Sequence, residues 1–152
     1  MTANLIFIGA AACAGIGEQT VKPQSTVLTI RKTSEFINQE RQFYLYFRCF
    51  LDEFYRTDQS RRPGLIEEPP VNIPSFRYAV PYMAAAVHKL TNTYGLDSPP
   101  WIFEDRCFLP DGEPYFGLNA VISELRLYLM YESPAEFKYR NLFVPRNALS
   151  RA

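Results

Sequence analysis

Large apolar side chains recur at helical spacing between residues 35 and 55, and this pattern constrains the fold more than any other feature. Three series repeat every seven residues: Phe36, Phe43 and Phe50; Ile37, Tyr44 and Leu51; Phe47 and Phe54. Such a repeat places its members on one side of an α-helix, so the segment has a broad apolar face. Ser34 is suited to cap its amino end. The pattern predicts a helix from Glu35 to Tyr55 that packs against other helices.

Further segments have helical features of their own. A helix over 76–93 ends at Gly95 and turns these residues inward: Tyr78, Tyr82, Ala85, Ala86 and Leu90. A helix over 119–131 turns these inward: Val121, Ile122, Leu125, Leu129 and Met130. Ser133-Pro134-Ala135-Glu136 has the form of a capping box with Ser133 as N-cap, which predicts a short helix. We therefore expect an all-α fold: a compact bundle of four to five helices with long loops rich in proline and aromatic residues, and with short extended pieces near 27–30 and 142–144.

Length and composition fit a single helical domain over residues 31–152. The chain has 152 residues, of which 47% are hydrophobic and 21% charged, so a wholly disordered protein is excluded. Residues 1–30 are predicted to be an apolar N-terminal arm or extension, because residues 1–17 carry no charged side chain. The run is shorter than the ~20 residues of a membrane span. A signal peptide fits its length but lacks the basic start, and this alternative stays open beside the arm and the extension.

Charge and ligand residues exclude several classes of function. Sixteen basic and sixteen acidic side chains cancel, which disfavours a general binder of nucleic acid or of membrane surfaces. The only histidine is His88, and the three cysteines lie far apart, so we expect no metal site and reduced thiols in the cytoplasm: Cys13, Cys49 and Cys107. We find no phosphate-binding glycine loop and no convincing nucleophile–base set. We therefore expect neither enzymatic activity nor a cofactor.

A long loop and the carboxyl-terminal tail hold the candidate binding residues. Aromatic and arginine side chains dominate protein interfaces, and many of them lie outside the expected helices. The predicted partner-binding residues are Trp101, Tyr115, Phe116, Arg140, Asn141, Phe143, Asn147 and Arg151. A structural interpretation competes with this one, in which Asn141 ends a helix and Arg140 pairs with Glu132 or Glu136. Another alternative is a nucleic-acid-binding regulator that uses arginine and tyrosine patches at the carboxyl end.

The carboxyl-terminal tail has a distinctive amino-acid sequence. Residues 132–144 read ESPAEFKYRNLFV and residues 147–152 read NALSRA. Together with FLDEFY at 50–55, EEPP at 67–70 and the stretch 82–101, this resembles a family of small, largely uncharacterised bacterial cytosolic proteins. The resemblance spans about residues 43–152. It implies a gene beside that of a nucleotidyltransferase-like protein, an arrangement similar to toxin–antitoxin pairs. We therefore expect a non-catalytic, cytoplasmic protein-binding module, the antitoxin-like partner of a nucleotidyltransferase-like toxin, with no membrane contact.

Overall fold

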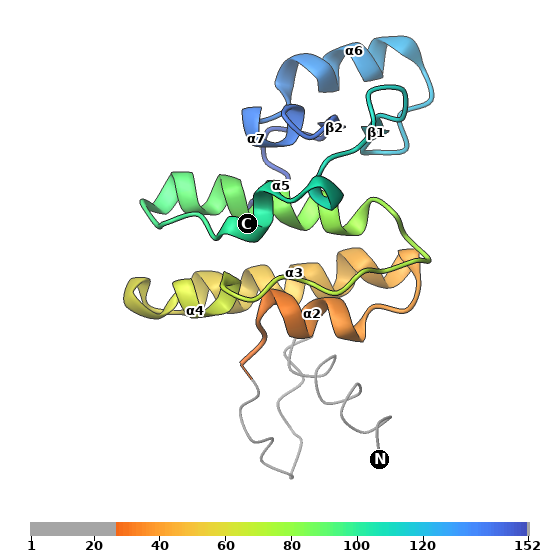
Figure 1. Cartoon of the computed structure of the whole chain (residues 1–152). Helices are drawn as coiled ribbons and strands as arrows, with labels where there is room; N and C mark the ends of the chain where they lie inside the picture. The colour runs from red at the N-terminus through yellow and green to blue at the C-terminus, as the bar shows by residue number, and fades with distance from the viewer. Residues whose placement is uncertain (1–26, 152) are drawn as a thin grey trace. The chain divides into compact units, whose positions relative to one another are not determined.

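The computed structural model describes residues 27–151, and contacts within the chain divide it into two units that meet between Phe76 and Arg77. The described part of the N-terminal unit is residues 27–76, and that of the C-terminal unit is residues 77–151 (Figure 1). The predicted arm over 1–30 lies almost wholly outside the described residues. The single domain predicted over 31–152 stays a prediction.

The N-terminal unit is built on a pair of helices. It comprises α2 (Ile30–Phe36), α3 (Glu40–Arg56), the 3₁₀ turn η1 (Gln59–Arg61) and α4 (Pro63–Ile66). The predicted apolar face of α3 is confirmed: Phe43, Phe47, Phe50 and Phe54 are buried, and successive rings pack 5.6–6.2 Å apart.

The predicted start of this long helix is wrong. Ser34 lies inside α2, where its hydroxyl donates to the Arg31 carbonyl at 2.6 Å and accepts from the Val71 N–H at 2.9 Å. Helix α2 is capped by Thr29, and it ends at Ile37, which is extended. A box of Gln39 and Gln42 then starts α3. These glutamines satisfy the free N–H groups that a serine or threonine cap usually satisfies. The sequence therefore shows no typical capping residue at the break between α2 and α3.

The C-terminal unit is built on one long helix, on which short helices and irregular segments pack. It comprises α5 (Ala79–Tyr94), η2 (Pro100–Phe103), η3 (Asp105–Cys107), β1 (Tyr115–Phe116), α6 (Ser123–Glu132), α7 (Ala135–Lys138) and β2 (Leu142–Phe143). Gly95 ends α5 with φ of 66°, as predicted. α7 and both 3₁₀ turns pack on α5.

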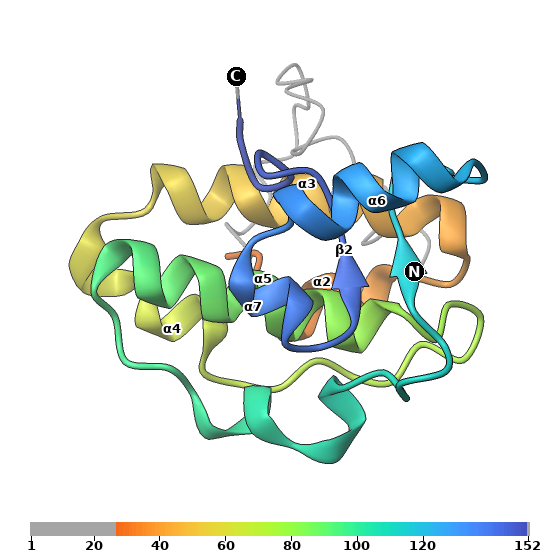
Figure 2. The same ribbon diagram turned by 90° about the horizontal axis from the view of Figure 1, so that it is seen from above.

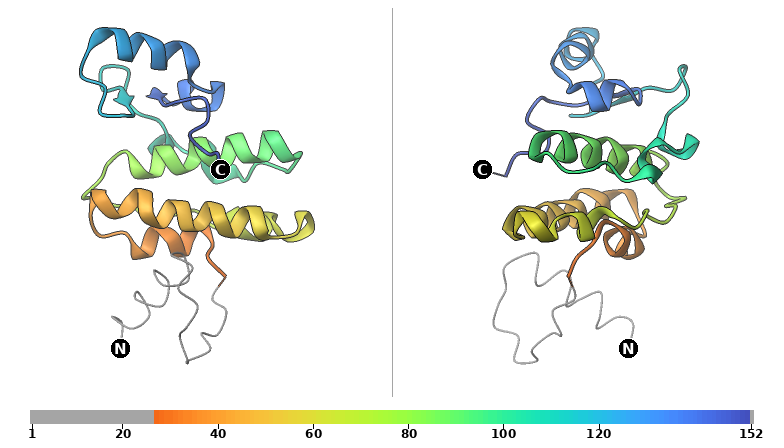
Figure 3. Two further views of the ribbon diagram at one scale, coloured as in Figure 1. Left: turned by 180° about the vertical axis from the view of Figure 1, so that it is seen from behind. Right: turned by 60° about the vertical axis from the view of Figure 1, so that its left-hand side comes forward.

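The two short strands pair in parallel, and β2 packs on both α7 and α6. Tyr115 pairs with Leu142 and Phe116 with Phe143, which confirms the extended piece predicted near 142–144 (Figure 2). The piece predicted near 27–30 forms no strand: Thr29 has an extended backbone and caps α2, and Ile30 begins that helix. α6 packs on β2 with one side and faces outward with the other (Figure 3). The prediction of a mainly helical fold is confirmed by the described residues.

The capping box predicted at Ser133 is wrong. Pro134, not Ser133, precedes α7, and the Ser133 hydroxyl is buried between α6 and β2. It donates to the Leu142 carbonyl at 3.2 Å and accepts from the Val144 N–H at 3.1 Å. These backbone groups belong to the outer edge of β2. β1 does not cover this edge, so its buried backbone groups have no strand partner and the Ser133 hydroxyl takes that place.

None of the described helices is both long and apolar enough to cross a bilayer. Within residues 27–151 no group of three or more histidine, cysteine and acidic side chains gathers as metal ligands would. Cys107 is a buried free thiol, whereas Cys49 is disulfide-bonded, so the expectation of reduced thiols is wrong for Cys49.

Candidate functional site

The structure separates the eight predicted partner-binding residues. Trp101 and Arg140 are buried. Asn147 is exposed, and Arg151 is partly exposed near the end of the tail. The other four are half-buried and come together at the strand pair: Tyr115, Phe116, Asn141 and Phe143.

The strand-pair residues contact one another and their surroundings. The rings of Phe116 and Phe143 stack 5.1 Å apart, and the Tyr115 ring lies 4.9 Å from that of Tyr78. Asn141 has φ of 63°, and its side-chain amide donates to the carbonyls of Pro110 and Asp111. Asparagine tolerates this left-handed backbone. Asn141 lies between α7, whose C-cap is Tyr139, and β2, which begins at Leu142, so it turns the chain between the two and does not itself end the helix.

Arg140 is fully buried and ties three segments together. Its Nη1 donates to the Glu136 carbonyl at 3.0 Å and to Nδ1 of His88 at 3.1 Å, while Nη2 donates to the Ile102 carbonyl at 2.8 Å. The guanidinium lies between the rings of Phe103, Phe108 and Tyr139, at 5.0–5.9 Å. α5, η2 and the end of α7 are joined at this one side chain.

Glu132 and Glu136, the two residues expected to pair with Arg140, have other partners. Glu132 pairs with Arg146 at 3.1 Å, and the Glu136 carboxylate accepts from Asn92 at 2.9 Å. Arg140 forms no ion pair within the described residues, and its Nε is buried without a hydrogen-bond partner there. The expected pairing of Arg140 with Glu132 or Glu136 is therefore wrong. Glu136 contributes its backbone carbonyl instead.

The electrostatics of this cluster do not suit catalysis. Arginine can only donate, so Nδ1 of His88 must accept and the ring must be neutral. Burial, together with the charge of Arg140, lowers the pKa of His88, against a smaller opposing effect of Glu136. Burial raises the pKa of Cys107 to about 11, and its Sγ lies 3.2 Å from the Trp101 carbonyl. A thiol with so high a pKa is not a reactive nucleophile at neutral pH.

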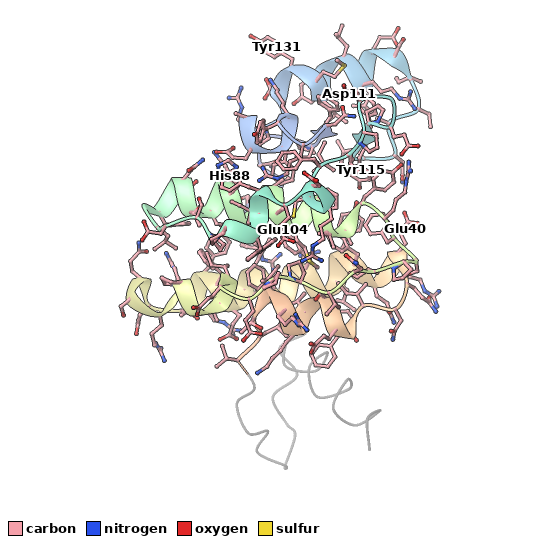
Figure 4. The ribbon with its side chains drawn as sticks, in the orientation of Figure 1. Glu40, His88, Glu104, Asp111, Tyr115 and Tyr131 are labelled. Atoms are coloured by element: carbon pink, nitrogen blue, oxygen red, sulfur yellow. The ribbon has the colours of Figure 1, made fainter. Side chains whose placement is uncertain are left out.

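Most of the exposed large apolar side chains of the described residues lie elsewhere, on and just before α6. Seven large side chains there are between 46% and 81% exposed, and we call them the α6 surface: Leu118, Val121, Ile122, Leu127, Tyr128, Met130 and Tyr131. Figure 4 shows Tyr131 pointing away from the unit, on the opposite side of α6 from α7. Leu129 is the only buried residue of α6. Monomeric proteins rarely expose apolar patches larger than a few hundred Å², and larger ones mark interaction sites.

Three residues predicted to face inward belong to this surface. Val121, Ile122 and Met130 are exposed, whereas Leu129 is buried as predicted. α6 begins only at Ser123, so Val121 and Ile122 precede it and do not share its periodicity. With one neighbouring layer to pack on, a ten-residue helix buries a single narrow stripe, and the remaining apolar side chains stay outside.

Charged side chains around the α6 surface are engaged within the C-terminal unit. Arg126 donates to the Ala120 carbonyl at 2.8 Å and lies over the Phe116 ring. Lys138 donates to the Tyr131 carbonyl at 3.0 Å. On the outward face of α6 itself, Glu124 is the single charged residue between the amino end and Tyr131. The surface is therefore apolar with an acidic margin.

The backbone that leads into α6 is strained. Leu118 and Asn119 have φ of 57° and 49°, and the Ala120 N–H donates to the Gly117 carbonyl at 3.1 Å. Positive φ at both central residues is the pattern of a type I′ turn. Asparagine accepts this conformation, but leucine does so at a cost of roughly 1–2 kcal/mol. The turn holds the Leu118 side chain in solvent, next to the exposed residues of α6.

A scan against protein-family models found no match to this chain, and searches of curated proteins and of solved structures found none either.

Sequence reasoning missed the α6 surface, although a signal was present. Apolar residues occupy all sides of the segment 121–131, with Leu127, Tyr128 and Tyr131 beside the expected inward set. A helix that is apolar all round is either enclosed or meets a partner. The contact of His88 with Arg140 carried no comparable signal, because it joins residues 52 positions apart.

Proposed function

We propose that this helical chain is a non-catalytic protein-binding module and that it binds through the α6 surface. The observation that carries the proposal is a set of seven large apolar side chains held in solvent beside a strained turn. Covering apolar surface gains about 25 cal/mol per Å², and a protein is the partner that offers apolar area of this extent. Strain of this kind is typical of functional segments.

A protein partner is favoured over nucleic acid by the state of the arginines. Phosphate binding needs cations that are free to meet the backbone. Arg140 is buried among aromatic rings, and Arg146 is paired with Glu132. In the N-terminal unit, Arg62 donates to the carbonyls of Phe54 and Thr57, which close α3. These three arginines therefore make contacts within their own units.

The resemblance of the tail to small bacterial proteins adds a candidate for the partner. On that basis we propose an antitoxin-like role, in which the chain binds a nucleotidyltransferase-like protein. The α6 surface supports only the proposal that the chain binds a protein. The proposed identity of that protein rests on the resemblance.

Co-purification tests the proposed function. The tagged full chain is captured from a lysate of a host that carries its gene, and bound proteins are identified by mass spectrometry. Leu127→Glu places a charge at the centre of the α6 surface and should weaken capture about thirtyfold or more, as loss of a hot-spot residue does. Leu45→Glu is the matched control, because Leu45 is also a helical leucine, half-exposed, on α3.

Two results would contradict the proposal. One is a folded Leu127→Glu protein that retains its partner at the wild-type level. The other is nucleic acid, detected by its absorbance, as the only stoichiometric component that co-purifies. Circular dichroism of both variants shows that the comparison is made between folded proteins.

A further inference from the structure

The outward face of α6 has a simple layout. Residues three and four apart lie on one side of a helix, so Glu124, Leu127, Tyr128 and Tyr131 form a single stripe. Leu127 lies about 200° around the helix from the buried Leu129, given about 100° per residue. The stripe therefore faces directly away from the unit, with apolar side chains at its centre and a carboxylate at one end.

We infer that the partner at this stripe is a second copy of the chain, which packs its own α6 antiparallel across a two-fold axis. This inference rests on the proposed function, since it names the occupant of the same surface. A two-fold interface brings one patch against itself, so that patch must complement its own image. The stripe of α6 meets this requirement.

Complementarity follows from the order of residues along the stripe. With the axis between Leu127 and Tyr128, each Leu127 meets the Tyr128 of the second copy. Each Glu124 then meets a Tyr131, whose hydroxyl donates to the carboxylate. The two Glu124 residues lie at opposite ends of the helix pair, so no like charges face each other. A parallel pairing would instead set Glu124 beside Glu124.

The available area fits a dimer of ordinary size. A stable interface buries about 800 Å² on each partner. One aromatic side chain can bury about 150–250 Å². The two tyrosines and five aliphatic or thioether side chains of the α6 surface supply an area of this order only together, so the contact extends from the stripe to Met130 and to the exposed residues before α6. Because Arg126 and Lys138 are held by backbone carbonyls of their own unit, few charges need to lose their water when the two copies meet.

Analytical ultracentrifugation of the purified full chain in reducing buffer tests the inference. The expected result is a species of twice the 17.6 kDa chain mass that dissociates on dilution. Leu127→Glu enters the interface twice and should weaken dimerisation about a hundredfold or more. Leu45→Glu should dimerise as the wild type does. Tyr131→Phe removes one hydrogen bond to a carboxylate from each half of the interface and should weaken dimerisation about tenfold or more.

The outcomes separate this inference from the proposed function. A purified chain that stays monomeric at all concentrations overturns the second-copy inference. If that monomer still captures a partner that Leu127→Glu loses, the proposed function stands with a different occupant. If Leu127→Glu affects neither mass nor capture, both are overturned. A dimer that Leu127→Glu leaves intact places the interface elsewhere and also overturns the inference.

Discussion

Two polar side chains of the tail link distant segments of the C-terminal unit. Ser133 satisfies the outer edge of β2, and Arg140 joins α5, η2 and α7. The sequence pattern predicted that Ser133 caps a helix. The abundance of arginine and aromatic residues outside the expected helices predicted that Arg140 binds a partner. Ser133 acts through backbone groups, and Arg140 acts through backbone carbonyls and the His88 ring. The fold brings these groups together from distant segments, so no local pattern in the sequence indicates the contacts.

The role of Ser133 predicts a clear loss of stability. Ser133→Ala leaves the buried Val144 N–H and Leu142 carbonyl without this partner, so the free energy of unfolding should fall by about 1–3 kcal/mol. Ser123→Ala is the control, because the Ser123 hydroxyl is exposed and contacts only the neighbouring Glu124 carboxylate. That control should stay within about 0.5 kcal/mol of the wild type. Equal shifts of the two urea midpoints would show that the buried bridge does not form.

The contact between His88 and Arg140 predicts a pH dependence. The folded state lowers the pKa of His88, so the contribution of this residue to stability is complete above about pH 6.5. As the pH falls below that value, the unfolded chain takes up a proton that the folded chain does not. The free energy of unfolding of the wild type should therefore fall between pH 7 and pH 5.

His88→Gln is the matched variant for this measurement, since its amide oxygen can still accept from Arg140 but does not titrate. Its urea-unfolding profile should be flatter than that of the wild type over the same range. Burial would raise the pKa of Glu136, but the hydrogen bond from Asn92 lowers it overall, so Glu136 titrates at lower pH. Parallel profiles for the two proteins would contradict the assignment of a neutral His88.

At the level of single elements, periodicity succeeded where one face was buried. α3 turns its phenylalanines inward as predicted, because its opposite face is polar and only one orientation buries the rings. α6 has no polar face, so several orientations bury similar apolar area. The sequence therefore could not determine which of its residues face outward. Packing on β2 selects Leu129.

The turn before α6 predicts opposite effects on stability and on association. Leu118→Asn relieves the left-handed strain and removes a side chain that is 62% exposed, so the free energy of unfolding should rise by about 0.5–1 kcal/mol. The same change removes part of the α6 surface and should weaken dimerisation. Stability is measured by urea unfolding at a concentration where the chain is monomeric. A variant that is less stable than the wild type would show that the turn is not strained.

At the scale of the whole molecule, the helical class, the aromatic core of α3 and the glycine that ends α5 could be predicted from the sequence. Their determinants are local, because spacing and turn chemistry lie within a few residues. The strand pair, the Arg140 cluster and the α6 surface could not be predicted in the same way. Each depends on residues from separate parts of the chain, which only the folded backbone brings together.

The apolar amino-terminal arm is predicted to be dispensable for folding. It lies outside the helical periodicity, and the Thr29 cap that starts α2 remains when residues 1–25 are deleted. The melting temperature of the truncated chain in reducing buffer should therefore stay within a few degrees of the full chain. A loss of cooperative melting would place Leu5 to Ile8 in the core.

Hydroxyl-radical footprinting of the purified chain shows whether a second copy covers the α6 surface. Labelling of Leu127, Tyr128 and Tyr131 is compared between dilute and concentrated samples, with Leu45 as the internal reference. We expect the three α6 residues to become protected as the concentration rises, while labelling of Leu45 does not change. Dimers in which the α6 residues are labelled as strongly as in the monomer would contradict this expectation.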